Sequence, residues 1–190
     1  AAALFLGIFI WRTLIVGKDD VMEKILMTLI SRGHVLLDDV PGTGKTTAAL
    51  AFHRALGLRY GRIQFTPDVL PSDIVGFSIY RKESGTFVYQ PGAVMTNLLL
   101  ADEINRTSSK TQAALLEVME ERQVTVDGVT HPLPVPFAVI ATQNPIEEEG
   151  TFNLPEAQMD RFMMKAVMTY PSAQEEQRML AMLTRRGSDT

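Results

Sequence analysis

The segment from Asp39 to Thr46, which reads Asp-Val-Pro-Gly-Thr-Gly-Lys-Thr, constrains the fold of this chain more than any other part of its sequence. It follows a short apolar run at 34–37 and precedes a helical pattern over 46–56. A strand, a glycine-rich turn and a helix in this order form a phosphate-binding loop, because the turning backbone and the amino end of the helix direct N–H groups at an anion. Lys45 can reach the β- and γ-phosphates of a nucleotide, and the Thr46 hydroxyl can ligate Mg²⁺.

One position departs from the usual phosphate-binding pattern. That pattern begins with glycine, whereas Asp39 stands there in this chain. A chance occurrence of the short Gly-Thr-Gly-Lys-Thr string is the alternative to a phosphate-binding loop, and the strand–turn–helix context argues against it.

A second feature is the apolar stretch Leu98 to Ala101, which ends in two adjacent carboxylates, Asp102 and Glu103. Open α/β sheets place their functional groups at the carboxyl ends of strands, where these two residues fall. Asp102 would hold Mg²⁺ through water, and Glu103 would polarise the attacking water as a general base. Taken alone, the pair is better explained as solvated carboxylates at a helix start. The phosphate-binding loop, 57 residues upstream when counted from Lys45, favours the catalytic interpretation.

Two further polar residues follow these elements along the chain. Asn144 ends the apolar run that starts at Val139, where it can hydrogen-bond a γ-phosphate or orient water; the alternative is a turn residue before a proline. Arg161 lies near the end of a short helix expected at 155–162, and its planar guanidinium suits a phosphate in a neighbouring subunit. The alternative for Arg161 is a surface salt bridge with Asp160 or Glu156.

Short apolar runs alternate with helical stretches, which is typical of an α/β fold with a mostly parallel sheet. We therefore expect a three-layer αβα sandwich of the phosphate-binding-loop type, with β-hairpin insertions. The expected helices cover 19–31, 46–56, 107–122 and 155–162, with another from about 172, and the expected strands cover 34–37, 62–66, 97–101 and 137–142. The expected hairpins turn at Glu83-Ser84-Gly85 and at Asp127-Gly128.

The length of 190 residues suits one well-buried α/β domain and the start of a second. The formal net charge of −4 argues against a nucleic-acid-binding protein, because such proteins carry a basic surface. Cysteine is absent, which excludes disulfides and thiolate metal sites and fits a reducing compartment, so a cytoplasmic location is expected.

The first residues are apolar from Ala1 to Ile10, without a charge. This run is shorter than the roughly 20 residues that cross a bilayer, and it lacks the basic start of a signal peptide. The interpretation we favour is a buried or truncated helix. The alternative, the end of a membrane segment, leaves direct membrane contact open.

Taken together, these elements and several longer strings resemble the MoxR branch of the AAA+ ATPases, over nearly all of 16–182. The most specific strings start at His34 (His-Val-Leu-Leu), Gln64 (Gln-Phe-Thr-Pro-Asp), Leu70 (Leu-Pro-Ser-Asp-Ile), Ala101 (Ala-Asp-Glu-Ile-Asn-Arg), Met119 (Met-Glu-Glu-Arg-Gln-Val-Thr-Val-Asp-Gly) and Ala141 (Ala-Thr-Gln-Asn-Pro-Ile). Within this family's looser pattern, Asp39 is an acceptable variant.

The resemblance implies a role for each candidate residue. The nucleotide-binding residues it implies are Val16 and Gly17 beside the adenine pocket, then Pro41, Gly42, Thr43, Gly44, Lys45, Thr46 and Thr47 of Walker A, and Asp102 of Walker B. Mg²⁺ would be held by Thr46 and Asp102, with ATP as the nucleotide. Catalytic roles fall to Glu103 of Walker B, Asn144 as sensor 1 and Arg161 as arginine finger. The hairpins at 78–89 and 123–134 match insertions that face the central pore or a client in related proteins.

The resemblance also implies a homo-oligomeric ring, with a hexamer expected, and an unidentified client protein. It divides the chain into an apolar segment at 1–15, a nucleotide-binding core at 16–170 and the start of a helical lid at 171–190. Two departures stand out. The apolar run before Thr13 is unlike the polar helix of the family, and the sensor 2 arginine expected in the lid falls beyond Arg185 and Arg186.

The function expected from the sequence is ATP hydrolysis that drives the remodelling or activation of a client protein, or the insertion of a metal cofactor into it. A phosphate-loop kinase is disfavoured by Glu103 and Asn144, which point to water as the acceptor. A non-hydrolysing, nucleotide-gated scaffold stays an alternative, although it would lack Glu103. A DNA-associated AAA+ motor or transcriptional activator shares all four elements, and the acidic balance of the chain argues against it.

Overall fold

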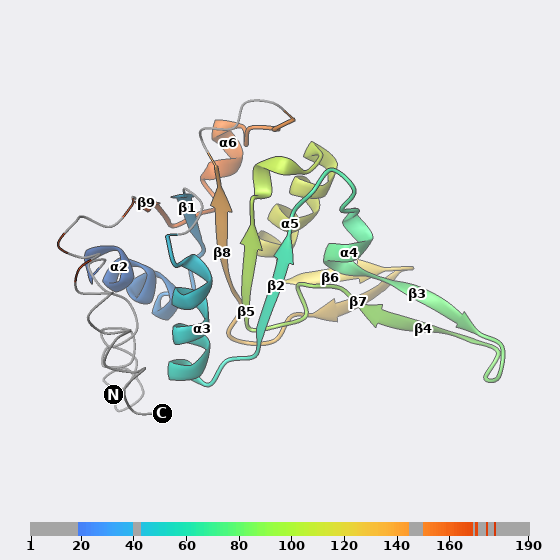
Figure 1. Ribbon diagram of the computed structural model, residues 1–190. Coiled ribbons are helices and arrows are strands. Elements are labelled where there is room, and N and C mark those ends of the chain that lie inside the picture. Colours follow the sequence, from blue (N-terminus) through green and yellow to red (C-terminus); the bar gives the residue numbers. More distant parts are fainter. Residues whose placement is uncertain are drawn as a thin grey trace.

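The computed structural model describes residues 19–39, 43–144, 150–168, 170, 174 and 177. Within this part of the chain, five parallel strands form one sheet in the order β2-β5-β8-β1-β9 (Figure 1). Their bounds are β1 Val35–Asp39, β2 Tyr60–Gln64, β5 Leu98–Asp102, β8 Ala138–Gln143 and β9 Met164–Met168. All five strands run the same way, so their carboxyl ends meet at one edge of the sheet.

Helices cover both faces of this sheet and produce the expected three layers (Figure 1). One face carries α2 (Asp19–Ile30) and α3 (Lys45–Leu56), and the other carries α4 (Pro71–Val75) and α5 (Ser109–Glu121). A 3-10 turn, η1 (Ile104–Arg106), follows β5, and a short helix, α6 (Glu156–Met159), precedes β9. The three-layer α/β prediction is therefore confirmed.

The interior strand β5 shows how one run of apolar residues supports two helical layers. All five of its residues are buried. Leu98 and Leu100 belong to the core beneath α2 and α3, whereas Leu99 and Ala101 belong to the core beneath α5. Side chains of a strand alternate between the two faces of a sheet, so a strand covered on both sides is apolar throughout.

Two antiparallel hairpins extend from the α5 side of the fold: β3 (Gly76–Arg81) with β4 (Thr86–Pro91), and β6 (Gln123–Val126) with β7 (Val129–Pro132). The second turns at Asp127 and Gly128, which both have positive φ angles, of 50° and 78°. Two successive positive φ angles define the hairpin turn that an Asp-Gly pair favours. Both hairpin predictions are confirmed.

The strand β2 lies two residues earlier than expected, at Tyr60–Gln64 rather than 62–66. This shift matters because it places Gln64 directly beside Asp102 in the parallel register of β2 and β5. The sequence alone left the register open, since no residue of β2 is fully buried and its apolar pattern is weak.

Three elements, α4, η1 and β9, were not predicted, and one expected helix was too long. Helix α4 begins with Pro71 as its first residue, and the Asp73 carboxylate accepts a hydrogen bond of 2.8 Å from the Leu70 N–H. A proline followed by an acidic residue is a start signal that would have revealed this helix. The edge strand β9 was also missed; only Met168 of its five residues is buried, so its apolar pattern is weak. Helix α6 covers four residues rather than eight, so Arg161 lies just beyond it.

Several expected features lie outside the described residues. They include the apolar run at 1–15, the adenine-pocket pair Val16 and Gly17, and Pro41 and Gly42 of the loop. The helix expected from about 172 and the lid expected at 171–190, with Arg185 and Arg186, also lie outside them except for residues 174 and 177. Among the described residues, no helix combines the length and the apolarity needed to cross a membrane.

Candidate functional site at the carboxyl ends of the strands

The turn that follows β1 brings a lysine to the carboxyl end of β5. Gly44 caps the amino end of α3 with a φ of 88°, a left-handed conformation that residues with a Cβ rarely adopt. Lys45 is the first residue of α3, and its Nζ lies 2.8 Å from Oδ1 of Asp102. The structure therefore joins the glycine-rich segment and the acidic strand end, as the sequence predicted.

Asp102 is buried, with 2% of its side chain exposed, and both of its oxygens have donors. Oδ1 accepts from Lys45 and from the Thr142 hydroxyl at 2.8 Å, while Oδ2 accepts from Nη2 of Arg62 at 2.7 Å. Burial raises the pKa of Asp102, but the hydrogen bonds from Lys45, Arg62 and Thr142 together outweigh it and leave the pKa below its ordinary value. Asp102 is therefore an ionised carboxylate at neutral pH.

Glu103 occupies a left-handed backbone conformation, with a φ of 57° and a ψ of 50°, at the point where β5 turns into η1. Its Oε2 accepts a hydrogen bond of 2.8 Å from Nε2 of Gln64 and lies 3.4 Å from Nη1 of Arg106. Its backbone N–H donates to the Thr142 hydroxyl at 2.9 Å. The same hydroxyl donates to Asp102, so Thr142 on β8 fixes both adjacent carboxylate residues.

Asn144 follows β8 and is held by a buried asparagine of the neighbouring turn. The Asn105 amide donates to the Asn144 carbonyl at 3.0 Å, and its Oδ1 accepts from the Asn144 N–H at 3.3 Å. The Gln112 amide in turn donates to the carbonyls of Ile104 and Phe152, at 3.0 and 2.7 Å. These bonds link the turn after β5 to the end of β8, where the candidate sensor residue lies.

The three candidate threonines lie around Lys45. Thr43 is buried ahead of α3, Thr46 is partly buried in the first turn of that helix, and Thr47 is exposed. Thr46 directly follows Lys45, so it lies at the same end of α3, the end that faces Asp102.

Arg161 lies apart from the other candidate residues. Its guanidinium contacts the Glu120 carboxylate of α5, with Nε at 3.0 Å and Nη2 at 2.9 Å from Oε2. This partner differs from the Asp160 and Glu156 considered from the sequence. The Met163 N–H donates to the His34 carbonyl at the start of β1. Arg161 therefore lies near the amino end of β1, about one strand length, roughly 15 Å, from the loop that follows this strand. Within one subunit, Arg161 does not join Lys45 and Asp102.

The sequence missed four residues that complete the site: Arg62 and Gln64 of β2, Asn105 of η1 and Thr142 of β8. Arg62 and Gln64 are two positions apart on one strand and therefore point to the same face. Polar side chains at alternate positions of β2 could have indicated these residues. This signal is usable only once it is known that β2 lies beside β5, whose end is acidic.

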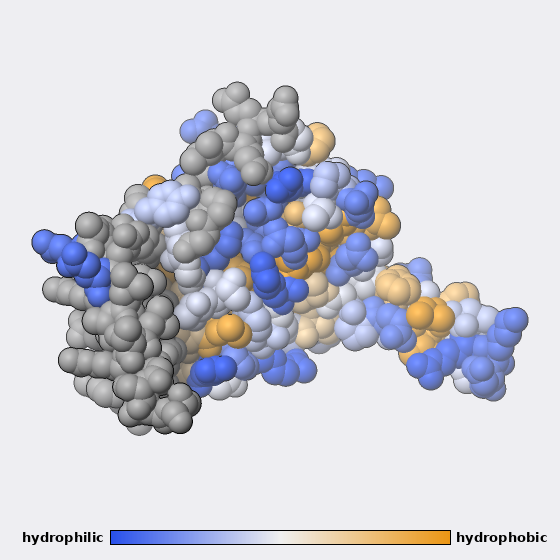
Figure 2. Space-filling model, in the orientation of Figure 1, coloured by the Kyte–Doolittle hydropathy of each residue, from blue (hydrophilic) through white to orange (hydrophobic). Residues whose placement is uncertain are grey.

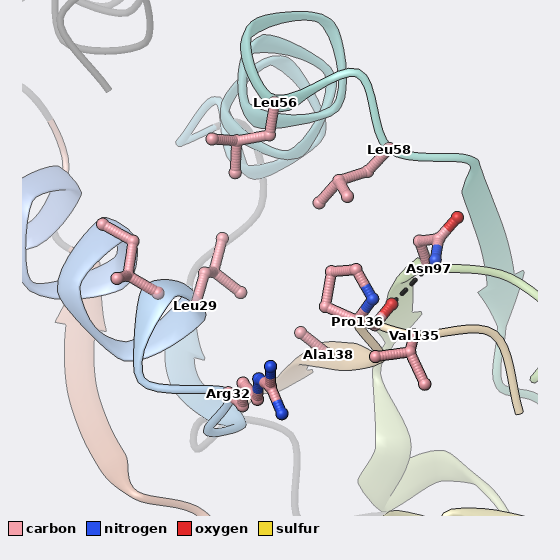
Figure 3. Close-up of a pocket in the computed structure, with 9 residues that line it drawn as sticks. Leu29, Arg32, Leu56, Leu58, Asn97, Val135, Pro136 and Ala138 are labelled. Atoms are coloured by element: carbon pink, nitrogen blue, oxygen red, sulfur yellow. Dashed lines mark hydrogen bonds between the residues drawn. The ribbon is translucent and has the colours of Figure 1, made fainter. Parts of the chain in front are cut away.

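An apolar cavity of about 370 Å³ lies at the opposite edge of the sheet (Figure 3). Leu29 of α2, Leu56 at the end of α3 and Val135 face it, and the Asn97 amide donates to the Pro136 carbonyl at its rim. None of the described residues that line this cavity is a carboxylate, and the cavity lies apart from the site at the carboxyl ends.

The two hairpins form a separate surface with polar and apolar side chains, away from the carboxyl ends of the parallel strands. A cleft of about 580 Å³ between them is lined by Phe87 and Tyr89 of β4 and by Val129 and His131 of β7. The rings of Tyr89 and His131 stack with centroids 3.9 Å apart, and Phe87 is 72% exposed. Figure 2 shows apolar atoms along the projecting arm that β3 and β4 form.

Comparison with known proteins agrees with this geometry. A family model described as "ATPase family associated with various cellular activities (AAA)" matches residues 34–164. An uncharacterised Bacillus subtilis protein, YeaC, is 58% identical over 85% of this chain and 50% of its own length. Chaperone MoxR1 of Mycobacterium tuberculosis is 53% identical over 92% of this chain and 46% of its own length.

The fold has a solved counterpart as well. The crystal structure of a Cytophaga hutchinsonii protein assigned as an ATPase superposes with a TM-score of 0.85, at 44% identity, over 99% of this chain and 56% of that one. The chain spans about half the length of the curated relatives it matches. The chain belongs to the ATPase family associated with various cellular activities, and within it to the MoxR family of AAA+ ATPases.

Proposed function

We propose that the protein hydrolyses ATP with Mg²⁺ at the carboxyl ends of β1, β5 and β8. Membership of an ATPase family implies that the domain binds ATP. The observation that carries the proposal is the 2.8 Å ion pair between Lys45 and the buried carboxylate of Asp102. It brings the phosphate-binding loop and the acidic strand end together, although 57 residues separate them in the sequence.

The residues at this site fit a magnesium–nucleotide ligand. Mg²⁺ prefers oxygen ligands, and an ionised Asp102 carboxylate with the Thr46 hydroxyl supplies them. When bound, Mg²⁺ would neutralise negative charge on the β- and γ-phosphates. Lys45 is placed at the amino end of α3, so its ammonium can exchange the Asp102 carboxylate for phosphate oxygens.

The remaining roles follow from the hydrogen bonds. Glu103 would accept the proton of the attacking water, since its carboxylate is partly exposed and lies beside Asp102. The Asn144 side chain would orient that water or the γ-phosphate, with Asn105 fixing its backbone. Most of the rate enhancement would come from positioning and from charge stabilisation.

Arg161 would act on the nucleotide of a neighbouring subunit. Its distance from the Lys45 loop supports this role, because an arginine on the far side of the domain reaches a phosphate only across an interface. The active form we propose is a homo-oligomeric ring, with a hexamer as the expected size. The division into a core at 16–170, a preceding apolar segment and a lid from 171 also stays a proposal, as does a cytoplasmic location.

The experiment compares Lys45→Ala and Glu103→Gln in the full-length protein, with Lys24→Ala as control. Lys24 forms an exposed ion pair with Asp20 on α2, away from the site. Loss of ATP binding in Lys45→Ala, together with retained binding and lost turnover in Glu103→Gln, supports the assignment. Equal loss of binding in both variants contradicts it. Tight binding without turnover in the wild type would instead favour a nucleotide-gated scaffold.

We further propose that the mechanical output is the remodelling or activation of a client protein, or the insertion of a metal cofactor into it. The cleft between the hairpins supports this, since exposed aromatic side chains such as Phe87 offer a surface for a polypeptide. A relative named a chaperone adds support. ATP-dependent binding of DNA that weakens with salt would favour a DNA-associated motor instead.

A further inference from the structure

One arginine contacts the candidate metal carboxylate and the residue that holds the candidate base. Nη2 of Arg62 lies 2.7 Å from Oδ2 of Asp102 and 3.0 Å from Oε1 of Gln64. Nε2 of Gln64 donates to Oε2 of Glu103 at 2.8 Å. Arg62 is 45% exposed, so it is not required to fill the core.

The orientation of the Gln64 amide depends on this arginine. A guanidinium only donates hydrogen bonds, so the side of the amide that faces Arg62 must be the carbonyl oxygen. The NH₂ group then has to face Glu103, whose carboxylate only accepts. Without Arg62, the amide oxygen loses this donor, so the Gln64 side chain that bonds Glu103 is less firmly fixed.

The same guanidinium neutralises the side of Asp102 opposite Lys45. Lys45 binds Oδ1 and Arg62 binds Oδ2, so a cation that approaches Asp102 meets a positive charge on each side. Lys45 would turn to the phosphates of a bound nucleotide, whereas Arg62 lies on β2 and stays beside the carboxylate. Arg62 therefore opposes metal binding at Asp102 through like-charge repulsion.

We propose that Arg62 is a positioning residue that couples the metal carboxylate Asp102 to the base Glu103 through Gln64. The proposal rests on the hydrolytic function above and deepens it. Arg62 keeps Glu103 in a fixed position by orienting the Gln64 amide. It also weakens the affinity of Asp102 for a divalent cation, so that metal occupancy and the position of Glu103 are energetically linked.

The test uses the full-length protein with Arg62→Met, Gln64→Leu and the double variant. Arg62→Met lowers kcat roughly tenfold with little change in KM, because the Gln64 amide no longer holds Glu103 firmly, and tenfold corresponds to about 1.4 kcal/mol. Since Arg62 acts through Gln64, the double variant has the same kcat as Gln64→Leu alone. Effects that multiply, or a kcat that rises in Arg62→Met, overturn the positioning role.

A second readout does not depend on turnover. The affinity for Mn²⁺, measured by electron paramagnetic resonance on the ADP-loaded protein, rises roughly three- to tenfold in Arg62→Met, because a like charge beside the carboxylate is gone. Arg62→Lys keeps the wild-type Mn²⁺ affinity and recovers part of kcat. Arg59→Met, an exposed arginine just before β2, leaves both values unchanged.

The two proposals fail in different ways. A wild-type protein that binds Mn²⁺ and ADP without any turnover contradicts hydrolysis, and the Mn²⁺ measurement still decides whether Arg62 opposes the metal. An active wild-type protein whose Mn²⁺ affinity is the same with and without Arg62 contradicts the coupling alone.

Discussion

Nζ of Lys45 lies 2.8 Å from Oδ1 of Asp102, and this ion pair joins the first residue of α3 to the last residue of β5. The carboxylate is buried and keeps two other donors, Arg62 and Thr142. The pair therefore contributes to the stability of the nucleotide-free domain as well as to the site.

We predict that Lys45→Ala lowers the free energy of unfolding of the nucleotide-free protein by about 1–3 kcal/mol, since a buried carboxylate loses one of its donors. Lys24→Ala, which removes an exposed pair with Asp20, should cost less than about 1 kcal/mol. Urea unfolding measures both values. Equal and small effects in the two variants would show that the Lys45–Asp102 pair does not stabilise the fold.

Variants of the ion pair between Arg161 and Glu120 can distinguish a role of Arg161 in turnover from a role in stability. The two side chains are 34% and 60% exposed, so the pair itself should contribute at most about 1 kcal/mol. Arg161→Ala should reduce turnover in the assembled protein by at least roughly tenfold without weakening nucleotide binding. Glu120→Ala removes the same pair but keeps the guanidinium. Turnover that falls equally in both variants would argue against Arg161 as the finger.

Asn105 should matter for turnover through Asn144. The Asn105 side chain is 2% exposed, and Asn105→Ala leaves the N–H and the carbonyl of Asn144 without these partners. We expect a loss of about 1–3 kcal/mol in stability and a lower kcat at nearly unchanged KM. Asn97→Ala, which removes an exposed amide bonded to Pro136, is the control. A KM effect without a kcat effect would contradict the positioning of Asn144 by Asn105.

His34 should make stability fall at acidic pH. Burial lowers the pKa of His34 from 6.5 to about 4, against a smaller opposing effect of the hydrogen bond to the Met119 carbonyl. The unfolded chain therefore binds the proton first. The contribution of His34 is complete above pH 6.5, decreases as the pH falls towards 4, and amounts to about 3 kcal/mol at most.

The matching measurement is the free energy of unfolding between pH 7 and pH 4 for the wild type and His34→Gln. Glutamine can accept from the Val139 N–H and donate to Met119 as His34 does, but it does not titrate. The variant should lose the His34 part of the pH slope. Parallel slopes in both proteins would exclude His34 as the source.

The cleft between the hairpins can be tested without knowing the client. Phe87 points to the same side of its hairpin as Tyr89, while Phe77 lies on the opposite side. Phe87→Ser should leave basal ATP turnover unchanged and reduce its stimulation by a reduced, permanently unfolded α-lactalbumin. Phe77→Ser should retain that stimulation. Loss in both variants would indicate that the whole arm, and not the cleft, is involved.

Local sequence determined most elements and their capping residues. Ser108 is a residue type that favours the start of a helix, and its hydroxyl accepts from the Thr111 N–H. Gly57 ends α3 in a left-handed conformation, directly after the helix expected at 46–56. These features depend on a few neighbouring residues, so they can be predicted from the chain alone.

The sequence predicted those residues of the candidate site that lie at the ends of strands. Lys45, Asp102 and Glu103 meet because parallel strands bring their carboxyl ends to one edge. Arg62 and Gln64 were missed because their place depends on the register between β2 and β5, which is a long-range property. The Glu120 partner of Arg161 was missed for the same reason, since 41 residues separate the two along the chain.

The sequence by itself determined the phosphate-loop α/β fold, the family and the residues of the loop and the acidic strand end, because apolar periodicity and glycine conformation act over a few residues. Only the tertiary structure decided the order of the strands, the hydrogen bonds from Arg62 through Gln64 to Glu103, and the separation of Arg161 from its own loop. The physical reason is that these relationships come from the packing of two helical layers on one sheet. Such packing depends on all the buried side chains at once rather than on any local stretch.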